Sequence, residues 1–261
     1  MMERKHETIL DLFKLDGLSA IVTGSRTGIG KALATALAEA GADLLINSRS
    51  KEGLEATAEE LRKPGRKIVT GIGDVGSKEV RGALIKKALD SFGKIDILVN
   101  NAGTTSRGPA LETPEDEWNR VLGVNLTGVF YMCQSAAKIM KEQGKGKIIN
   151  IASMLSFTGG INVISYTASK GGVAQLTKGL ANEWAKYHIN VNAIAPGYIK
   201  TDLTSALLKD TNRYNSIKSR IPAGDWAEPD DLKGAVVFLA SRASDYMHGT
   251  ILPVDGGYLG W

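Results

Sequence analysis

Residues 18–30 read LSAIVTGSRTGIG, and this stretch decides the fold. Its first half is an apolar run typical of a buried strand, and it leads directly into Gly24, Gly28 and Gly30. Residues 31–38 follow with strong helix formers and with apolar residues at helical spacing. Strand, glycine turn and helix are the context of a dinucleotide site, because glycines let the backbone approach a pyrophosphate and the helix N-terminus presents free N–H groups to it. The alternative is a tight loop that holds no ligand.

The alternation of strand and helix patterns continues to the C-terminus, without a linker-like change of composition. For a chain of 261 residues this predicts one α/β domain, a Rossmann-type doubly wound, seven-stranded parallel sheet flanked by helices. We assign this domain to residues 15–261 and interpret residues 1–14 as a flexible or docking arm. The seven strands are expected near residues 19–23, 43–47, 67–71, 95–100, 147–151, 190–195 and 250–254.

The composition favours no other class of protein. One cysteine, Cys133, excludes an intrachain disulfide and fits a reducing compartment, so we expect a cytoplasmic protein. The three histidines are scattered without metal-ligand spacing, and we predict no metal site. No apolar run is long enough for a membrane span, and the N-terminus lacks the apolar core of a signal peptide. The net charge of +4 comes from basic residues mixed with acidic ones, so we expect neither nucleic acid nor membrane as a partner.

A second motif lies in residues 165–170, SYTASK, where Tyr166 and Lys170 are four residues apart. On a helix over residues 166–187 they would be neighbours on one face, and a nearby ammonium would lower the tyrosine pKa from its ordinary value of about 10. Ser153 follows a predicted strand and would bring a hydroxyl for the reacting oxygen. The alternative for the tyrosine and lysine alone is a tyrosine packed under a lysine stem.

Two asparagine motifs complete the pattern. Residues 100–103, NNAG, end a predicted strand, at the edge of the sheet where ligands bind in doubly wound folds. Asn125 lies inside a helical pattern from about residue 115 to 143, where asparagine is unfavourable. The alternative for Asn125 is a residue that caps its own turn or faces solvent.

Together these motifs resemble the short-chain dehydrogenase/reductase family over nearly the whole chain from residue 18. The resemblance is carried by Thr23-Gly24-x-x-x-Gly28-Ile29-Gly30, Asn100-Asn101-Ala102-Gly103, Asn125, Ser153, Tyr166-x-x-x-Lys170 and Pro196-Gly197.

The resemblance implies a nicotinamide-dependent enzyme that interconverts a secondary alcohol and a ketone. It makes Tyr166 the acid or base, Ser153 the partner of the reacting oxygen, and Lys170 the cation that lowers the tyrosine pKa and holds the nicotinamide ribose. Asn125 would anchor a water that links Lys170 to solvent. The cofactor-binding residues that it implies are Gly24, Ser25, Arg26, Thr27, Gly28, Ile29, Gly30, Ser48, Arg49, Asp74, Val75, Asn101, Ala102, Gly103, Tyr166, Lys170, Pro196, Gly197, Ile199 and Thr201.

The end of the second predicted strand indicates which cofactor is preferred. An acidic residue there binds the ribose 2′-hydroxyl of NAD, whereas a nearby arginine suits the 2′-phosphate of NADP. Residues 46–50 read INSRS, with no acid, and Arg49 and Arg26 could pair with a phosphate. We therefore favour NADP(H), with NAD(H) as the alternative; Arg49 would then be an ordinary solvated loop residue.

Residues 146–161, 181–186, 190–198 and 220–224 are similar to the sugar-acid branch of the family. This branch includes the 2-dehydro-3-deoxy-D-gluconate 5-dehydrogenases, also called 2-deoxy-D-gluconate 3-dehydrogenases, and the gluconate 5-dehydrogenases. The substrate would be a sugar acid, contacted by Arg107, Ser153 and Tyr166, with Arg107 facing the carboxylate. The chain differs from these relatives in keeping one arginine in residues 104–107 and in reading GDWA at residues 224–227. The alternative for Arg107 is a surface loop residue.

Two other functions stay open. One is a 3-oxoacyl-carrier-protein reductase or another short-chain carbonyl reductase, and the other is a non-catalytic, cofactor-binding regulator. The polar stretch from Thr201 to about Ile221 is expected to be a loop that closes over the substrate, as in the family. The C-terminal Tyr258 and Trp261 look exposed, which, with family habit, favours a homotetramer.

Overall fold

The computed structural model describes residues 8–62 and 65–260. Its centre is one sheet of seven parallel strands in the order β3-β2-β1-β4-β5-β6-β7. This confirms the predicted seven-stranded parallel sheet. The strands are β1 (Ser19–Val22), β2 (Asp43–Ser48), β3 (Ile68–Ile72), β4 (Ile97–Asn100), β5 (Gly146–Ile151), β6 (Ile189–Pro196) and β7 (Ile251–Val254).

The strand order reverses between β1 and β4. The chain runs outward from β1 to β3 and then returns to place β4 on the other side of β1. In doubly wound sheets a crevice opens at such a switch, outside the carboxyl ends of the strands. The glycine turn after β1 and the asparagines after β4 therefore meet at one place.

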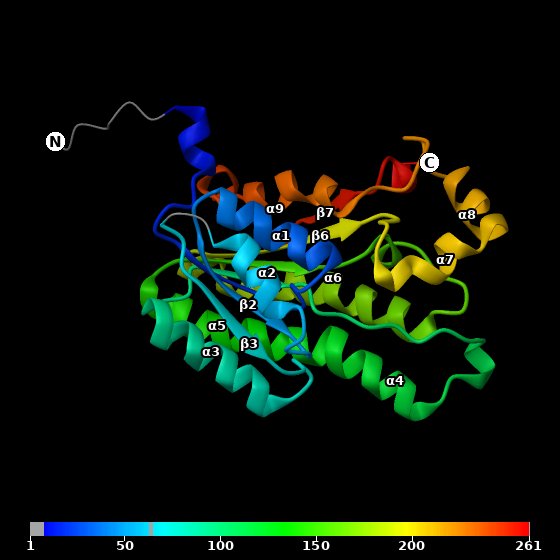
Figure 1. Ribbon diagram of the computed structural model, residues 1–261, viewed down its shortest axis with the longest axis horizontal. Helices are drawn as coiled ribbons and strands as arrows, with labels where there is room; N and C mark the ends of the chain where they lie inside the picture. The colour runs from blue at the N-terminus through cyan, green and yellow to red at the C-terminus, as the bar shows by residue number, and fades with distance from the viewer. Residues whose placement is uncertain (1–7, 63–64, 261) are drawn as a thin grey trace.

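Helices cover both faces of the sheet (Figure 1). Helices α1, α2 and α9 pack on one face and α3, α5 and α6 on the other, while α4, α7 and α8 lie beyond the carboxyl edge of the strands. The helices are α1 (Gly28–Glu39), α2 (Leu54–Leu61), α3 (Lys78–Phe92), α4 (Glu115–Leu122), α5 (Val129–Gln143), α6 (Ile164–Trp184), α7 (Ser205–Lys209), α8 (Thr211–Lys218) and α9 (Lys233–Ala240).

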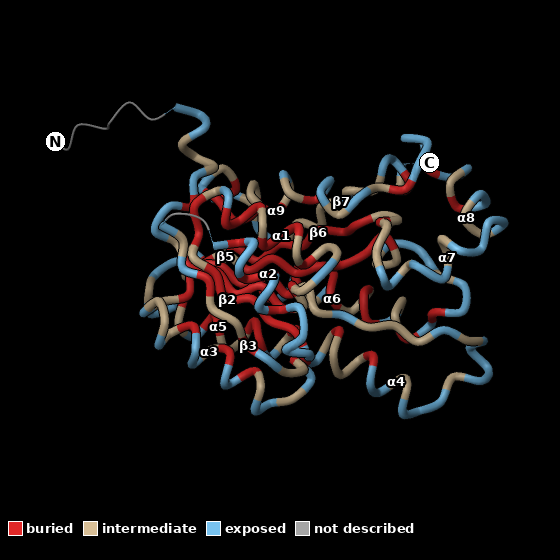
Figure 2. The backbone as a smooth tube through the Cα atoms, viewed as in Figure 1, coloured by how far each residue is buried: buried red, intermediate tan, exposed pale blue. Residues whose placement is uncertain are grey.

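The core has two halves because neighbouring strand residues point to opposite faces of the sheet. Ile21 and Leu45 pack with α3 and α5, whereas Val22 and Leu44 pack with α1 and α9. The strands are buried on both faces and read as continuous apolar runs, as expected for a parallel sheet. Figure 2 shows this buried centre, with exposed residues toward the outer helices and loops. Cys133 is fully buried on α5 and packs there as a small residue of the core.

The predicted helix over residues 115–143 is interrupted. A π-helical turn, Gly123–Gly128, separates α4 from α5. Asn125 lies in this turn, and its side chain bonds to a loop and to α6 rather than to its own helix. Such turns are frequent at functional sites, and helical periodicity alone cannot reveal them.

The polar stretch expected as a loop contains two short helices, α7 and α8. Asp210 stops α7 and caps α8 by accepting a hydrogen bond from the Arg213 backbone N–H at 3.0 Å. Tyr214 then stacks on Trp226, with ring centroids 5.6 Å apart, and donates a hydrogen bond to Asp225 at 2.6 Å. These contacts with residues outside the stretch are why the polar sequence is helical here.

The two ends of the chain differ from the expectation in one respect. Tyr258 is 7% exposed and packs against Tyr198, so the prediction that it is exposed is wrong, while Trp261 lies outside the described residues. Near the N-terminus a 3₁₀ turn, Ile9–Phe13, contacts α9 through the rings of Phe13 and Phe238. The division at residue 15 stays a prediction, and residues 1–7 of the arm lie outside the described residues. None of the helices in the described ranges is both long and apolar enough to cross a bilayer.

Candidate active site

The glycine turn after β1 forms one wall of a cleft at the switch between β1 and β4. Gly24 has a φ of +63°, and a Cβ there would lie 2.8 Å from the Ala102 backbone, so this position requires glycine. A Cβ at Gly30 would collide with the Gly24 carbonyl and the Asn101 side chain. The Asn101 amide donates to the carbonyls of Thr23 and Gly24, at 3.0 and 2.8 Å. The loop is therefore held tightly, with bare backbone facing the cleft.

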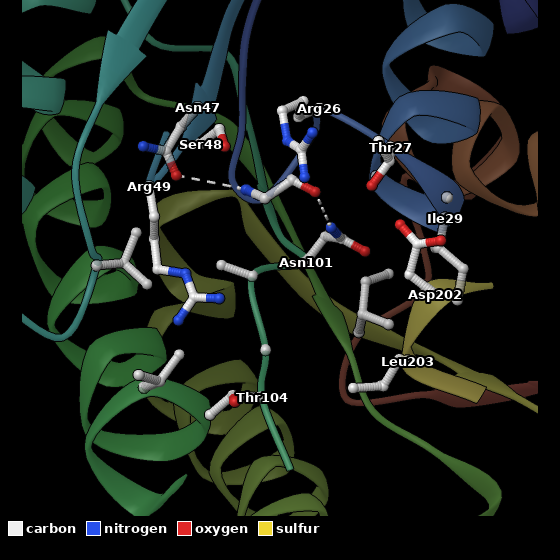
Figure 3. Close-up of a pocket in the computed structure, with 18 of the residues that line it drawn as sticks. Arg26, Thr27, Ile29, Asn47, Ser48, Arg49, Asn101, Thr104, Asp202 and Leu203 are labelled. Atoms are coloured by element: carbon white, nitrogen blue, oxygen red, sulfur yellow. Dashed lines mark hydrogen bonds between the residues drawn. The ribbon is translucent and has the colours of Figure 1, made fainter. Parts of the chain in front are cut away.

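The end of β2 supplies the second wall. Asn47 accepts a hydrogen bond from the Gly24 N–H (Figure 3). Its amide also donates to the carbonyls of Gly71 and Gly73. Arg49 and Arg26 line the cleft, and neither has an ion pair within the described part of the chain. The end of β2 carries no carboxylate.

The cleft has a volume of about 330 Å³. Of the predicted cofactor residues, Ser25, Pro196, Gly197 and Ile199 do not line it. Ser25 is buried beneath the turn and bonds to Val22 and Asn47, and Ile199 is 2% exposed in the core. The other sixteen predicted residues line the cleft together. The predicted set did not include Asn47, Gly73, Thr104, Val124, Ile151, Asp202 and Leu203, which also line it.

Asp202 and Leu203 lie across the cleft from Arg49 (Figure 3). They belong to the segment after β6, which the sequence identified as a moving loop but not as a wall of this cleft. Thr201, which precedes them, lies within 3.4 Å of the position a Gly28 Cβ would take.

Tyr166, Ser153 and Lys170 come together beyond the glycine turn. Ser153 follows β5, while Tyr166 and Lys170 lie one turn apart on α6. The Lys170 ammonium is 5.6 Å from the centre of the Tyr166 ring and donates a hydrogen bond to the Ile151 carbonyl at 2.6 Å. The helical register that the sequence predicted for Tyr166 and Lys170 is thus present.

Burial dominates the electrostatics of this group. It lowers the pKa of Lys170 from 10.5 to about 8, because a buried ammonium loses hydration. Burial also raises the pKa of Tyr166, while a hydrogen bond with Ser153 and the charge of Arg107 act in the opposite direction. The sequence led us to expect a lowered tyrosine pKa from Lys170. In the structure the lysine lies over the ring and bonds to Ile151, so burial outweighs its effect.

Asn125 is fully buried and fastens the loop after β4. Its amide donates to the Thr104 carbonyl at 2.8 Å and to Ser169 at 3.0 Å, and its oxygen accepts from the Thr104 N–H at 2.8 Å. Both donors of the side chain are therefore used by protein groups. Asn125 fixes Thr104, a wall of the cleft, and lines neither of the cavities described here.

A second cavity of about 680 Å³ adjoins the cleft. Tyr166 and Leu203 line both cavities, so the tyrosine hydroxyl belongs to their junction, and Ser153 lines the second cavity. Arg107 also lines it and donates a long, 3.5 Å hydrogen bond to the Leu203 carbonyl. Gly197 belongs to this second cavity rather than to the cleft.

A conserved-domain comparison matches residues 24–259 to a family described as enoyl-(acyl carrier protein) reductase, which is a division of the short-chain dehydrogenases. The chain belongs to the short-chain dehydrogenase/reductase family. It is therefore an oxidoreductase that acts on CH–OH groups. This family provides the expected context for a cleft and a second cavity that meet at a tyrosine, a serine and a lysine.

Relatives with assigned names are similar over nearly their whole length. The chain is 51% identical over 252 residues to the 2-dehydro-3-deoxy-D-gluconate 5-dehydrogenase of Escherichia coli, covering 96% of this chain and 99% of the relative. It is 44% identical to the 5-keto-D-gluconate 5-reductase of the same organism, covering 95% and 98%. A solved gluconate 5-dehydrogenase from Burkholderia cenocepacia, in complex with NADP and tartrate, is 43% identical with a TM-score of 0.93, covering 97% and 100%.

Proposed function

We propose that this short-chain dehydrogenase/reductase is an NADP(H)-dependent enzyme that interconverts a secondary alcohol and a ketone of a sugar acid of the gluconate or deoxy-gluconate type. The observation that carries the proposal is the junction of two cavities at Tyr166, one walled by the glycine turn and the other by arginines. The names of the similar relatives support the same substrate class.

The cleft fits an NADP cofactor. The glycine turn offers bare backbone, where a Cβ at Gly24 or Gly30 would block close approach. Arg26 and Arg49 would hold the 2′-phosphate, since charge-assisted arginine–phosphate contacts are strong and the end of β2 has no acid that would favour NAD. Asp74 and Val75 line the region expected for the adenine. The chemistry of a nicotinamide bound in this cleft is hydride transfer.

The protein side of the reaction is a proton transfer at the tyrosine. In oxidation, Tyr166 as phenolate would take the hydroxyl proton of the substrate, and in reduction its hydroxyl would return a proton to the carbonyl oxygen. The Ser153 hydroxyl would donate a hydrogen bond to the same oxygen. Lys170 would hold positive charge beside the ring and contact the cofactor ribose, and Asn125 would hold the loop that shapes the cleft.

We also propose a homotetramer in the cytoplasm. Exposed apolar side chains support association: Leu111 is fully exposed, Tyr131 is 42% exposed and Phe157 is 51% exposed. Light scattering on the purified protein would give its mass in solution, and a monomer would contradict the proposed assembly.

The first experiment is a steady-state assay with NADP⁺ and NAD⁺ against gluconate, 2-deoxy-gluconate and related hexonates, followed by the absorbance of reduced nicotinamide. The keto acids are run in the reverse direction. Turnover of a hexonate with preference for NADP⁺ is expected. If the protein shows no activity on these sugar acids in either direction but reduces a 3-oxoacyl thioester, it would instead be a 3-oxoacyl-carrier-protein reductase.

A further inference from the structure

The second cavity carries an excess of positive charge that no side chain neutralises. Three arginines line it, Arg107, Arg213 and Arg220, against one carboxylate, Asp210. One Asp210 oxygen is occupied in capping α8. Within residues 8–62 and 65–260, none of the three guanidinium groups forms an ion pair with a carboxylate. Arg213 is half-buried, whereas Arg107 and Arg220 are exposed, so all three guanidinium groups are open to a carboxylate that enters the cavity.

The three arginines occupy two different parts of the cavity. Arg107 lies at the junction with the cofactor cleft, since it bonds to Leu203, and its charge acts on Tyr166. Arg220 stacks over Tyr258, with its guanidinium carbon 4.7 Å from the ring centre. Tyr258 is in turn 5.6 Å from Tyr198, ring centre to ring centre. Arg220 therefore belongs to a wall built from residues that line the second cavity only.

Arg213 belongs to the same wall. It lies in the first turn of α8, and its charge, like that of Arg220, favours a lower pKa of Tyr198. The helix that carries it is held by Tyr214, which stacks on Trp226 and bonds to Asp225. Such support positions a guanidinium before a ligand arrives.

We propose that Arg213 and Arg220 form the carboxylate subsite of the second cavity. The inference rests on the proposed function. The similar relatives are named for a reaction at C5, and the fifth carbon of a hexonate is four bonds from the carboxylate carbon. A carboxylate held at the wall of Arg213 and Arg220, rather than beside Tyr166 at Arg107, leaves room for this separation. Arginine is suited to this task because its planar fork binds a carboxylate through two parallel hydrogen bonds.

The test measures how well the enzyme distinguishes a carboxylate. Arg213→Ala, Arg220→Ala and Arg107→Ala are assayed with NADP⁺ on gluconate and on the matching neutral alditol. For the first two variants, the ratio of kcat/KM for gluconate to that for the alditol is expected to fall about 10- to 100-fold. Arg213→Lys should recover part of the ratio. Lys209→Ala is the matched control, because it removes a positive charge at the end of α7 that does not line the cavity. A ratio that changes only in Arg107→Ala would overturn the subsite.

The position of the ketone is a second readout. Carbon NMR of the oxidised hexonate should show the 5-keto product for the wild type, and a 3-keto product would overturn the inference.

A binding measurement separates this inference from the proposed function. Gluconate is titrated calorimetrically into the Tyr166→Phe protein loaded with NADP⁺, with and without Arg213→Ala. Binding that depends on Arg213 in an enzyme that oxidises no hexonate would refute the proposed function and leave the subsite standing. Hexonate turnover that does not depend on Arg213 would refute the subsite and leave the proposed function standing.

Discussion

The cleft and the second cavity share a tyrosine but are built in different ways. The cleft is formed mainly by the ends of β1, β2 and β4, where backbone and short side chains are fixed by the buried sheet. The second cavity is formed mainly by the segments that follow β4, β5 and β6, by residues 203–220 and by Tyr258, which are separated in sequence and lie largely on loops and short helices. The cleft is therefore part of the central sheet, whereas the second cavity is built from segments that pack on that sheet.

This difference indicates which part of the molecule can change its substrate specificity without loss of the fold. A change in the cleft disturbs the sheet ends and the core beneath them, whereas a change on α7 or α8 alters the cavity and leaves the sheet intact. The following predictions test this contrast, beginning at the residue that both regions share.

Tyr166→Phe should have the largest effect. Removing the hydroxyl removes the group that is proposed to exchange a proton with the substrate, so kcat should fall by about 10²- to 10⁴-fold. The affinity for NADPH, measured by fluorescence titration, should change by less than about twofold, because the ring remains in place. A variant that kept more than a tenth of the activity would show that another group carries the proton.

Gly30→Ala tests the rigidity of the cleft. The added Cβ would collide with the Gly24 carbonyl and the Asn101 side chain, so the turn must shift. Overpacking of this kind costs about 1–3 kcal/mol, and NADPH binding should weaken by at least about tenfold. Gly82→Ala on α3 is the control, because nothing lies within 4 Å of its Cβ position and NADPH binding should be unchanged. Equal NADPH affinity in the two variants would mean that the glycine turn does not contact the cofactor.

Arg49→Ala tests the choice of cofactor. Losing a charge-assisted contact to the 2′-phosphate should lower kcat/KM for NADP⁺ about tenfold while leaving NAD⁺ nearly unaffected. The double variant with Arg26→Ala should lower the ratio further. Lys51→Ala, an exposed neighbour that does not line the cleft, serves as the control. A parallel loss with both cofactors would refute the role of Arg49 in recognising the phosphate.

The sequence was a good guide to the cleft and a poor one to the cavity. The seven strands and the glycine turn follow from local patterns, since apolar runs and glycines mark their positions directly. The side chain of Asn125 in the π-helical turn bonds to Thr104 in a loop and to Ser169 on α6, which are 21 and 44 residues away in sequence. Helical periodicity depends on nearby residues and cannot predict such distant partners. Likewise Arg213 was only one polar residue of a predicted loop, and Arg220 belonged to residues 220–224, whose resemblance to the sugar-acid branch assigned it no role. Their shared wall exists only once α8 has packed on Trp226.

Lys170 lines the cleft one helical turn from Tyr166, and its smaller, pH-dependent effect concerns stability. The pKa of Lys170 is about 8 in the folded protein and 10.5 for the ordinary side chain. Between these values the unfolded chain binds more protons, so the free energy of unfolding should rise with pH. Lys170→Met removes this dependence. The stability of the wild type relative to the variant should therefore increase by about 3 kcal/mol from pH 8 to 10.5.

Denaturant unfolding of the cofactor-free protein at several pH values measures this difference. Lys138→Met, an exposed change on α5, is the control and should give a difference that does not depend on pH in this window. Comparing each variant with the wild type at the same pH cancels the titration of the remaining groups. A pH-independent difference for Lys170→Met would mean that the ammonium is hydrated and that the cleft admits water as far as this lysine. A difference that follows the expected pH dependence would instead show that the cleft excludes water from the ammonium.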